Sequence, residues 1–132
     1  MIVFDSYAWV EYFMGSKRGA VAREYLEGGN IVTPDIVLAE VARKYVREGI
    51  DARDIGGRLY FISSHSEVEG IDADLSLATA DAWRELEIRA RRRKLKMPSL
   101  TDGIVLALAR KREAKVLTGD EHFKGLKEAI ML

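Results

Sequence analysis

Short apolar runs alternate with longer amphipathic stretches along the chain. The short runs have strand length and lie at residues 2–5, 31–33, 68–71, 115–118 and 129–132, the last at a sheet edge. The longer stretches follow the 3.6-residue period of helices and lie at residues 7–13, 18–27, 34–48, 51–63 and 72–94, with a further helix from residue 99. This alternation predicts an α/β fold, a single domain over residues 1–132 with a mostly parallel central sheet of four to five strands flanked by helices.

Cap and turn residues define several of the predicted boundaries. Thr33 precedes Pro34, which predicts a helix that is capped by Thr33 and has Pro34 in its first turn. The pair Gly56-Gly57 weakens the predicted helix over residues 51–63. Residues 103–109 are apolar nearly all round the helix, so we expect that helix to be buried on most sides.

Composition excludes several kinds of site. The chain has no cysteine and two histidines, which excludes disulfides, thiolate nucleophiles, iron–sulfur clusters and multi-histidine zinc sites. A metal bound here would be held by oxygen ligands, which favours Mg²⁺ or Mn²⁺. The N-terminus lacks the pattern of a signal peptide and no apolar run has membrane-spanning length, so we expect a cytoplasmic protein with no membrane association.

Basic residues cluster at one place although the total charge is balanced. The chain has 21 Lys and Arg against 21 Asp and Glu, which gives no global attraction for nucleic acid. Residues 89–96 nevertheless carry six positive charges in eight positions. Arg89, Arg92, Arg93 and Lys96 are therefore candidates for binding a nucleic-acid backbone. The alternative is a solvated helix end whose charges suit the helix dipole.

Two acids follow predicted strands directly. Asp5 comes after the first strand and Asp120 follows the strand over residues 115–118. In open parallel sheets the functional crevice lies beyond the carboxyl ends of the strands, so both acids are candidates for a site there. Taken singly, each has an ordinary structural explanation, because Asp5 could cap the next helix and Asp120 could be a turn residue.

Two further acids flank helical apolar stretches. Glu40 lies in a mostly apolar segment, yet it could reach solvent or pair with Arg43 or Lys44. Asp102 precedes the most apolar helix and could belong to a capping box that starts at Ser99. Four carboxylates in one crevice would repel each other, by about 1 kcal/mol per pair at roughly 4 Å in water and about 4 kcal/mol at a dielectric of 20. Such a cluster would need protons or a divalent cation.

Four segments in order resemble the motifs of PIN-domain nucleases. They are Val3-Phe4-Asp5-Ser6-Tyr7-Ala8-Trp9-Val10, Leu38-Ala39-Glu40-Val41, the stretch Thr101-Asp102-Gly103 with its apolar continuation, and Val116-Leu117-Thr118-Gly119-Asp120 with His122-Phe123. Each motif alone is weak, but their order and spacing cover essentially the whole chain. The chain is most similar to the VapC toxins of toxin–antitoxin pairs. Gly103 is a departure, since the family more often has alanine there.

The resemblance implies an endoribonuclease that depends on Mg²⁺ or Mn²⁺. It makes Asp5, Glu40, Asp102 and Asp120 the catalytic, metal-binding acids, with the hydroxyls of Ser6 and Thr118 in support. It also implies RNA as the substrate, a homodimer, and neutralisation by a small VapB-like antitoxin. His122, beside Asp120, is interpreted as peripheral because that position varies in the family.

Other readings of the acids fit less well. A phosphatase of the haloacid-dehalogenase type needs a second Asp at the position of Tyr7, and the acids do not follow the pattern of a response-regulator receiver. Two alternatives stay open: a PIN nuclease of RNA processing or decay without an antitoxin, and a non-catalytic PIN-like module that binds RNA or protein. Retention of all four acids argues against the module.

Overall fold

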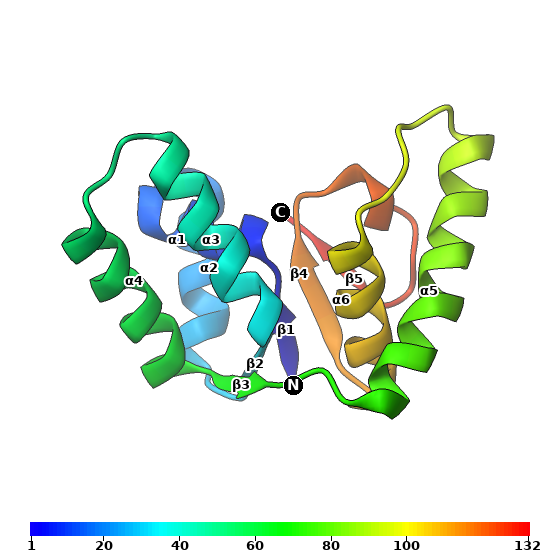
Figure 1. Ribbon diagram of the computed structural model, residues 1–132, viewed down its shortest axis with the longest axis horizontal. Coiled ribbons are helices and arrows are strands. Elements are labelled where there is room, and N and C mark those ends of the chain that lie inside the picture. The colour runs from blue at the N-terminus through cyan, green and yellow to red at the C-terminus, as the bar shows by residue number, and fades with distance from the viewer.

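Five parallel strands form the central sheet of the computed structural model, which describes residues 1–132 (Figure 1). Their order is β3-β2-β1-β4-β5. The strands are β1 (Ile2–Phe4), β2 (Ile31–Pro34), β3 (Glu67–Glu69), β4 (Lys115–Thr118) and β5 (Ala129–Met131). All four pairings are parallel, which confirms the predicted α/β fold. The chain builds outward from β1 to β3 and then returns to add β4 on the other side of β1, so the strand order reverses between β1 and β4.

Helices cover both faces of this sheet (Figure 1). They are α1 (Ser6–Met14), α2 (Lys17–Glu27), α3 (Asp35–Arg47), α4 (Ala52–His65), α5 (Ala73–Arg92) and α6 (Leu100–Lys111), with a 3₁₀ turn η1 (Glu121–Phe123). Successive strand residues point to opposite faces. Val3 of β1 accordingly joins the core under α5 and α6, whereas Phe4 joins the core shared with α1, α3 and α4. Two apolar layers thus fix β1 between them.

The start of α3 differs from the sequence prediction. Thr33 is not a helix cap but a fully buried residue of β2, because its strand pairs with β3 as far as Pro34. The Thr33 hydroxyl accepts a hydrogen bond from the Trp9 indole at 3.1 Å and donates one to Ser66 at 2.9 Å. Pro34 takes the cap position without any side-chain bond. Continued strand pairing therefore outweighed the local capping preference.

Close packing of α5 on α6 explains Gly103. Residues 103–109 are all buried, as the sequence predicts. A Cβ at residue 103 would lie 2.8 Å from the Cβ of Trp83 and 3.2 Å from the carbonyl oxygen of Thr79, both on α5. These atoms belong to a helix backbone and to the root of a side chain, so they cannot easily move aside. Glycine permits the two helices to approach at the end of α6 that carries Asp102.

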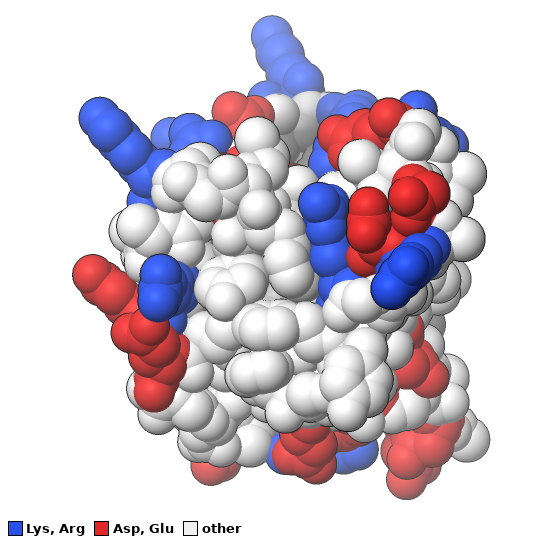
Figure 2. Space-filling model, turned by 90° about the vertical axis from the view of Figure 1, so that its left-hand side faces the viewer, with Lys and Arg blue, Asp and Glu red and all other residues white.

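The side of the molecule built by α1, α2 and α4 has a broad uncharged surface (Figure 2). Aromatic rings join α1 and α4: the ring of Phe61 lies 5.4 Å from that of Tyr12 and 5.7 Å from that of Phe13. Tyr12 and Phe13 also line a shallow hollow between α1 and α2. Its exposed side chains include the apolar ones of Met14, Val21 and Tyr60, and exposed apolar patches are typical of protein–protein contacts.

None of the helices combines the length and the apolar character needed to cross a membrane.

Candidate active site

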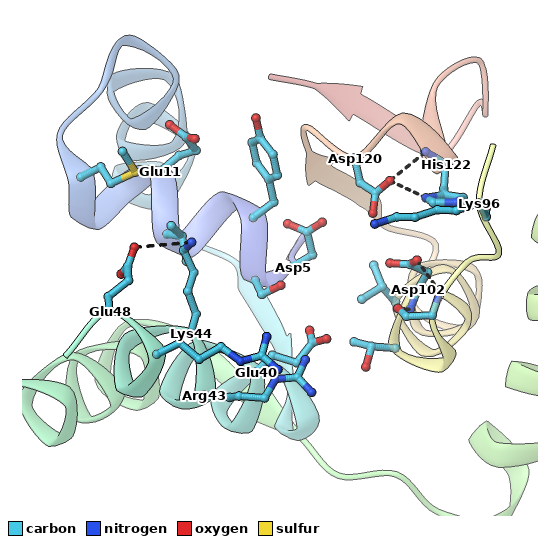
Figure 3. A pocket seen from close by; sticks show the side chains of 18 of the residues that line it. Asp5, Glu11, Glu40, Arg43, Lys44, Glu48, Lys96, Asp102, Asp120 and His122 are labelled. Carbon is cyan, nitrogen blue, oxygen red and sulfur yellow. Dashed lines mark hydrogen bonds and ion pairs between the residues drawn. The ribbon is translucent and has the colours of Figure 1, made fainter. Parts of the chain in front are cut away.

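A cleft of about 740 Å³ opens at the carboxyl ends of β1 and β4, where the strand order reverses (Figure 3). The helix α3 forms one wall. Asp5 at the end of β1, the start of α6 and the turn after β4 form the other, and α1 also lines the cleft. All four predicted acids line this cleft. Asp5 is far in sequence from Asp102 and Asp120, which come from two successive elements, and Glu40 faces them from α3 (Figure 3). The fold therefore brings together the acids that the sequence singled out.

Asp5 is the most deeply buried of these acids. It caps α1, accepting a hydrogen bond from the Ala8 N–H at 2.9 Å, and only 7% of the residue is exposed. Burial raises the pKa of the Asp5 carboxyl to about 7, and the negative charges of Asp120 and Asp102 act in the same direction. Hydrogen bonds from Thr118 and Ala8 oppose this shift but do not cancel it. Asp5 thus combines the capping role with a place in the cleft.

Asp102 also has both roles. Its carboxylate accepts a hydrogen bond from the Ser99 N–H at 2.9 Å, and its own N–H donates to the Ser99 hydroxyl at 3.1 Å, which completes a capping box. Burial raises the pKa of the Asp102 carboxyl, and the nearby charge of Asp120 adds to the shift. The cap therefore fixes the Asp102 carboxylate at the cleft, and its capping role does not exclude a second role there.

Asp120 is held in place by His122. One Asp120 oxygen accepts hydrogen bonds from the His122 backbone N–H at 2.8 Å and from ring atom Nδ1 at 2.7 Å. The other ring nitrogen, Nε2, lies 2.8 Å from the Lys96 carbonyl oxygen, to which it donates. Burial would lower the pKa of His122, but the bond to Lys96 and the charges of Asp120 and Asp102 outweigh it and raise the pKa. The two ring nitrogens thus both have an oxygen partner within the protein.

The sequence interpretation of His122 as peripheral missed these contacts. His122 is 7% exposed and lines the cleft. The available signal was local: an Asp at the start of a 3₁₀ turn accepts from the residue two positions on, which places that side chain beside the carboxylate. Variation within a family does not exclude such a contact in one member.

The two predicted supporting hydroxyls occupy different positions. Thr118 ends β4, is fully buried, and accepts a hydrogen bond from the Asp120 N–H at 3.0 Å. Because it also lies beside Asp5, it connects the ends of the two central strands. Ser6 begins α1 and lines the cleft next to Asp5.

Glu40 stands apart from the other acids. It lies half-buried on the cleft side of α3 and forms no ion pair with Arg43 or Lys44. Lys44 instead lies 3.6 Å from Glu48 (Figure 3). The simple structural explanation, an ion pair on the helix surface, therefore does not apply to Glu40.

The donor set of the cleft suits a hard divalent cation. Asp102, Asp120 and His122 each have a potential ligand atom within 4.8 Å of the others. Of these, the two carboxylates fit Mg²⁺ or Mn²⁺ best, since hard cations prefer oxygen ligands and both His122 nitrogens already contact oxygens of Asp120 and Lys96. Asp5 adjoins them closely enough that its pKa responds to both of their charges. A cation would offset the burial, and the lesser mutual repulsion, that raise the pKa values of Asp5 and Asp102.

The basic cluster at residues 89–96 divides into several environments. Arg89 and Arg93 donate to the carbonyl oxygens of Lys124 and Glu121, each at 2.6 Å, and so attach α5 to the chain around η1. Arg92 lines a separate hollow on α5, and Lys96 alone of the four candidates lines the cleft. Binding of RNA by these side chains stays a prediction.

The fold and the cleft together define a class: a five-stranded parallel α/β domain with acids at its strand-order reversal. The model of the PIN domain matches residues 2–129, and the chain belongs to the PIN-domain family. No curated protein matches the chain.

Solved structures of the same fold cover nearly the whole chain. A toxin–antitoxin complex from Klebsiella pneumoniae is similar over 99% of this chain and 97% of its own, with 18% identity and a TM-score of 0.72. VapC20 of Mycobacterium tuberculosis is a toxin that cleaves the sarcin–ricin loop. The similarity covers 97% of this chain and 96% of VapC20, with 22% identity and a TM-score of 0.72. The structure of VapBC2 of Rickettsia felis, bound to a DNA fragment from its promoter, is similar over 100% of this chain and 98% of its own, with 18% identity and a TM-score of 0.68.

Proposed function

We propose that the protein is an endoribonuclease that depends on Mg²⁺ or Mn²⁺ and uses Asp5, Glu40, Asp102 and Asp120. The observation that carries this proposal is the meeting of three acids from separate elements at the strand-order reversal, with the pKa of Asp5 and of Asp102 raised by burial and mutual charge. Membership of the PIN-domain family supports it, as does the likeness to a toxin that cleaves the sarcin–ricin loop.

The residues of the chain have separate tasks in this proposal. Asp5, Asp102 and Asp120 would hold the metal from one wall, with Glu40 facing them across the cleft. When bound, the metal would lower the pKa of a water and neutralise charge on the phosphodiester. His122 holds the Asp120 carboxylate in one orientation, and Thr118 anchors the backbone of the same turn.

The first test is cleavage of single-stranded RNA with Mg²⁺, and again with excess EDTA. We expect cleavage only with the metal, and its loss in Asp102→Asn. Asp51→Asn is the matched control, because Asp51 caps α4 by the same kind of bond, at 2.9 Å to the Asp54 N–H, but lies outside the cleft. Metal-independent cleavage, or equal cleavage by the two variants, would contradict the proposal. A wild-type protein that binds RNA but never cleaves it would instead support the non-catalytic module.

We further propose that the protein is the toxin of a toxin–antitoxin pair and forms a homodimer. Two of the similar structures are toxin–antitoxin assemblies. The broad uncharged surface over α1, α2 and α4 is suited to a protein contact (Figure 2). Co-expression with the product of a small neighbouring gene should yield a complex whose RNA cleavage is inhibited, and light scattering should show a dimer of the 14.8 kDa chain. Failure to find an inhibitor would favour an RNA-processing nuclease.

A further inference from the structure

The α3 wall of the cleft carries a stripe of basic side chains. Glu40, Arg43, Lys44, Arg47 and Glu48 all line the cleft. Their spacing of i, i+3, i+4, i+7 and i+8 places them on one face of the helix. The stripe begins at the predicted catalytic acid and runs away from the other three acids along the helix (Figure 3).

The neighbouring, buried face of α3 explains why this stripe points into the cleft. Val37, Val41 and Tyr45, spaced four residues apart, are buried in the core shared with α1 and α4. Burial of that apolar face fixes the rotation of the helix. The orientation of the basic stripe is therefore set by the core and does not depend on the charges themselves.

Two members of the stripe have no partner within the protein. Arg43 and Arg47 are exposed and form neither an ion pair nor a side-chain hydrogen bond, whereas Lys44 lies 3.6 Å from Glu48. Arg53, Arg84 and Arg92 also have no such partner, but they lie outside the cleft. The guanidinium groups of Arg43 and Arg47 are thus free to bind an anion in the cleft.

The charges of the cleft show what such a ligand would be. Six carboxylates line it together with four Lys and Arg side chains, and three of those four basic residues lie on α3. A polyanion would be repelled at the acidic end unless a cation neutralises it, and would be attracted along α3. Arg43 and Arg47 are one turn apart, about 6 Å along the helix, which is comparable to the separation of neighbouring phosphates in a single strand. Guanidinium groups bind phosphate oxygens in a bidentate manner.

We propose that Arg43 and Arg47 form a phosphate-binding track, which holds the backbone of single-stranded RNA along α3 beside the bond to be cleaved. This inference rests on the proposed nuclease function and names the path that the substrate takes into the same cleft. The track positions RNA by its backbone and carries no preference for base sequence.

The test measures KM and kcat for an RNA oligonucleotide over a series of KCl concentrations. For the double variant Arg43→Gln/Arg47→Gln we expect KM to rise about tenfold or more, while kcat changes by less than about twofold. The slope of log KM against log salt should fall by about 1.4, since each phosphate contact to a single strand contributes about 0.7. Lysine at both positions should keep the salt slope and lose part of the affinity, because lysine lacks the planar fork.

Arg53→Gln is the matched control: Arg53 is an exposed arginine of α4 without an ion pair and outside the cleft. A double variant that matches this control in KM and in salt slope would overturn the track. So would a loss of affinity for a protein inhibitor with RNA binding unchanged, since the wall would then be a protein contact.

A second readout separates the track from the nuclease proposal. Fluorescence anisotropy of labelled RNA with EDTA present measures binding without cleavage. If the wild-type protein does not cleave RNA, the nuclease proposal fails, yet weaker RNA binding by the double variant would still uphold the track. If the wild-type protein cleaves and the double variant binds as tightly as Arg53→Gln, the nuclease proposal holds and the track is wrong.

Discussion

The two walls of the cleft are built in opposite ways. On one wall, Asp5, Asp102 and Asp120 each accept a hydrogen bond from a backbone N–H of their own segment, so their carboxylates are fixed by caps at strand and helix ends. On the other wall, Arg43 and Arg47 are exposed and unpaired. The first arrangement suits chemistry that needs fixed geometry, and the second suits a flexible strand that is held by charge.

The charges of the two walls also affect the stability of the folded protein differently. The acidic wall buries carboxylates in a place that disfavours their charged form, so the ionisation of Asp5 and Asp102 opposes folding. The basic wall lies in solvent, where single charges contribute little to folding. Substitutions in the two walls should therefore change activity and stability in different proportions.

The largest effect is expected for Asp5→Asn. The substitution keeps an oxygen that can accept the bond from Ala8 but removes the charge that the metal would bind. We expect kcat/KM for RNA cleavage in Mg²⁺ to fall by about 10²-fold or more, as for other residues that stabilise charge in the transition state. Activity within about twofold of wild type would show that Asp5 is only a helix cap.

His122→Ala should have the next largest effect. It removes both the bond that orients Asp120 and the bond to the Lys96 carbonyl. Partners that orient a metal ligand are typically worth 10–100-fold in metal affinity or activity. We expect the Mg²⁺ concentration for half-maximal cleavage to rise by about tenfold. A lower melting temperature with an unchanged Mg²⁺ requirement would mean that His122 only fills space.

Asp5→Asn should also stabilise the metal-free protein, in a way that depends on pH. The pKa of Asp5 is about 7 in the folded protein and near 3.8 when unfolded, so the folded state binds the proton more tightly. Wild-type stability should then fall as pH rises from about 4 to 7, by about 1.4 kcal/mol per unit from this group, and level off above it. Urea unfolding with EDTA should show the variant to be more stable at pH 8 and equal to wild type at pH 4. An equal difference at both pH values would contradict this.

Gly103→Ala tests the packing that supports the acidic wall. The added Cβ would lie 2.8 Å from the Cβ of Trp83, so α5 and α6 would have to separate. We expect a loss of about 1–3 kcal/mol in the free energy of unfolding, although alanine is the better helix former. Stability equal to or above that of wild type would show that the helices adjust freely.

The smallest effect on stability is expected on the basic wall. Arg43→Gln/Arg47→Gln breaks no hydrogen bond or ion pair within the protein. The free energy of unfolding should change by less than about 0.5 kcal/mol while KM for RNA rises. A substantial loss of stability would mean that these arginines contribute to the fold.

The fold and the acidic wall were largely predictable from the sequence, and the basic wall was not. The strand and helix pattern predicted the sheet, positions after strands singled out Asp5 and Asp120, and the resemblance to PIN-domain nucleases joined Asp102 to them. Their structural and functional interpretations turned out to be compatible, since one carboxylate oxygen can cap a helix while the group faces a cleft.

The basic stripe was missed because charged residues at this helical spacing occur on any solvent-exposed helix face. Only the burial of Val37 and Val41 shows which way Arg43 and Arg47 point. Thr33 was wrongly predicted to cap α3 for a related reason. A capping preference depends only on neighbouring residues, whereas the pairing of β2 with β3 is a contact between segments distant in sequence.

The most direct test of the metal-site assignment is anomalous diffraction from crystals soaked in Mn²⁺. We expect a manganese peak at about 2.1 Å, the distance typical of a small divalent cation, from carboxylate oxygens of Asp5, Asp102 and Asp120, with Glu40 facing it across the cleft. A cleft without manganese at saturating Mn²⁺, or manganese bound only elsewhere, would contradict it.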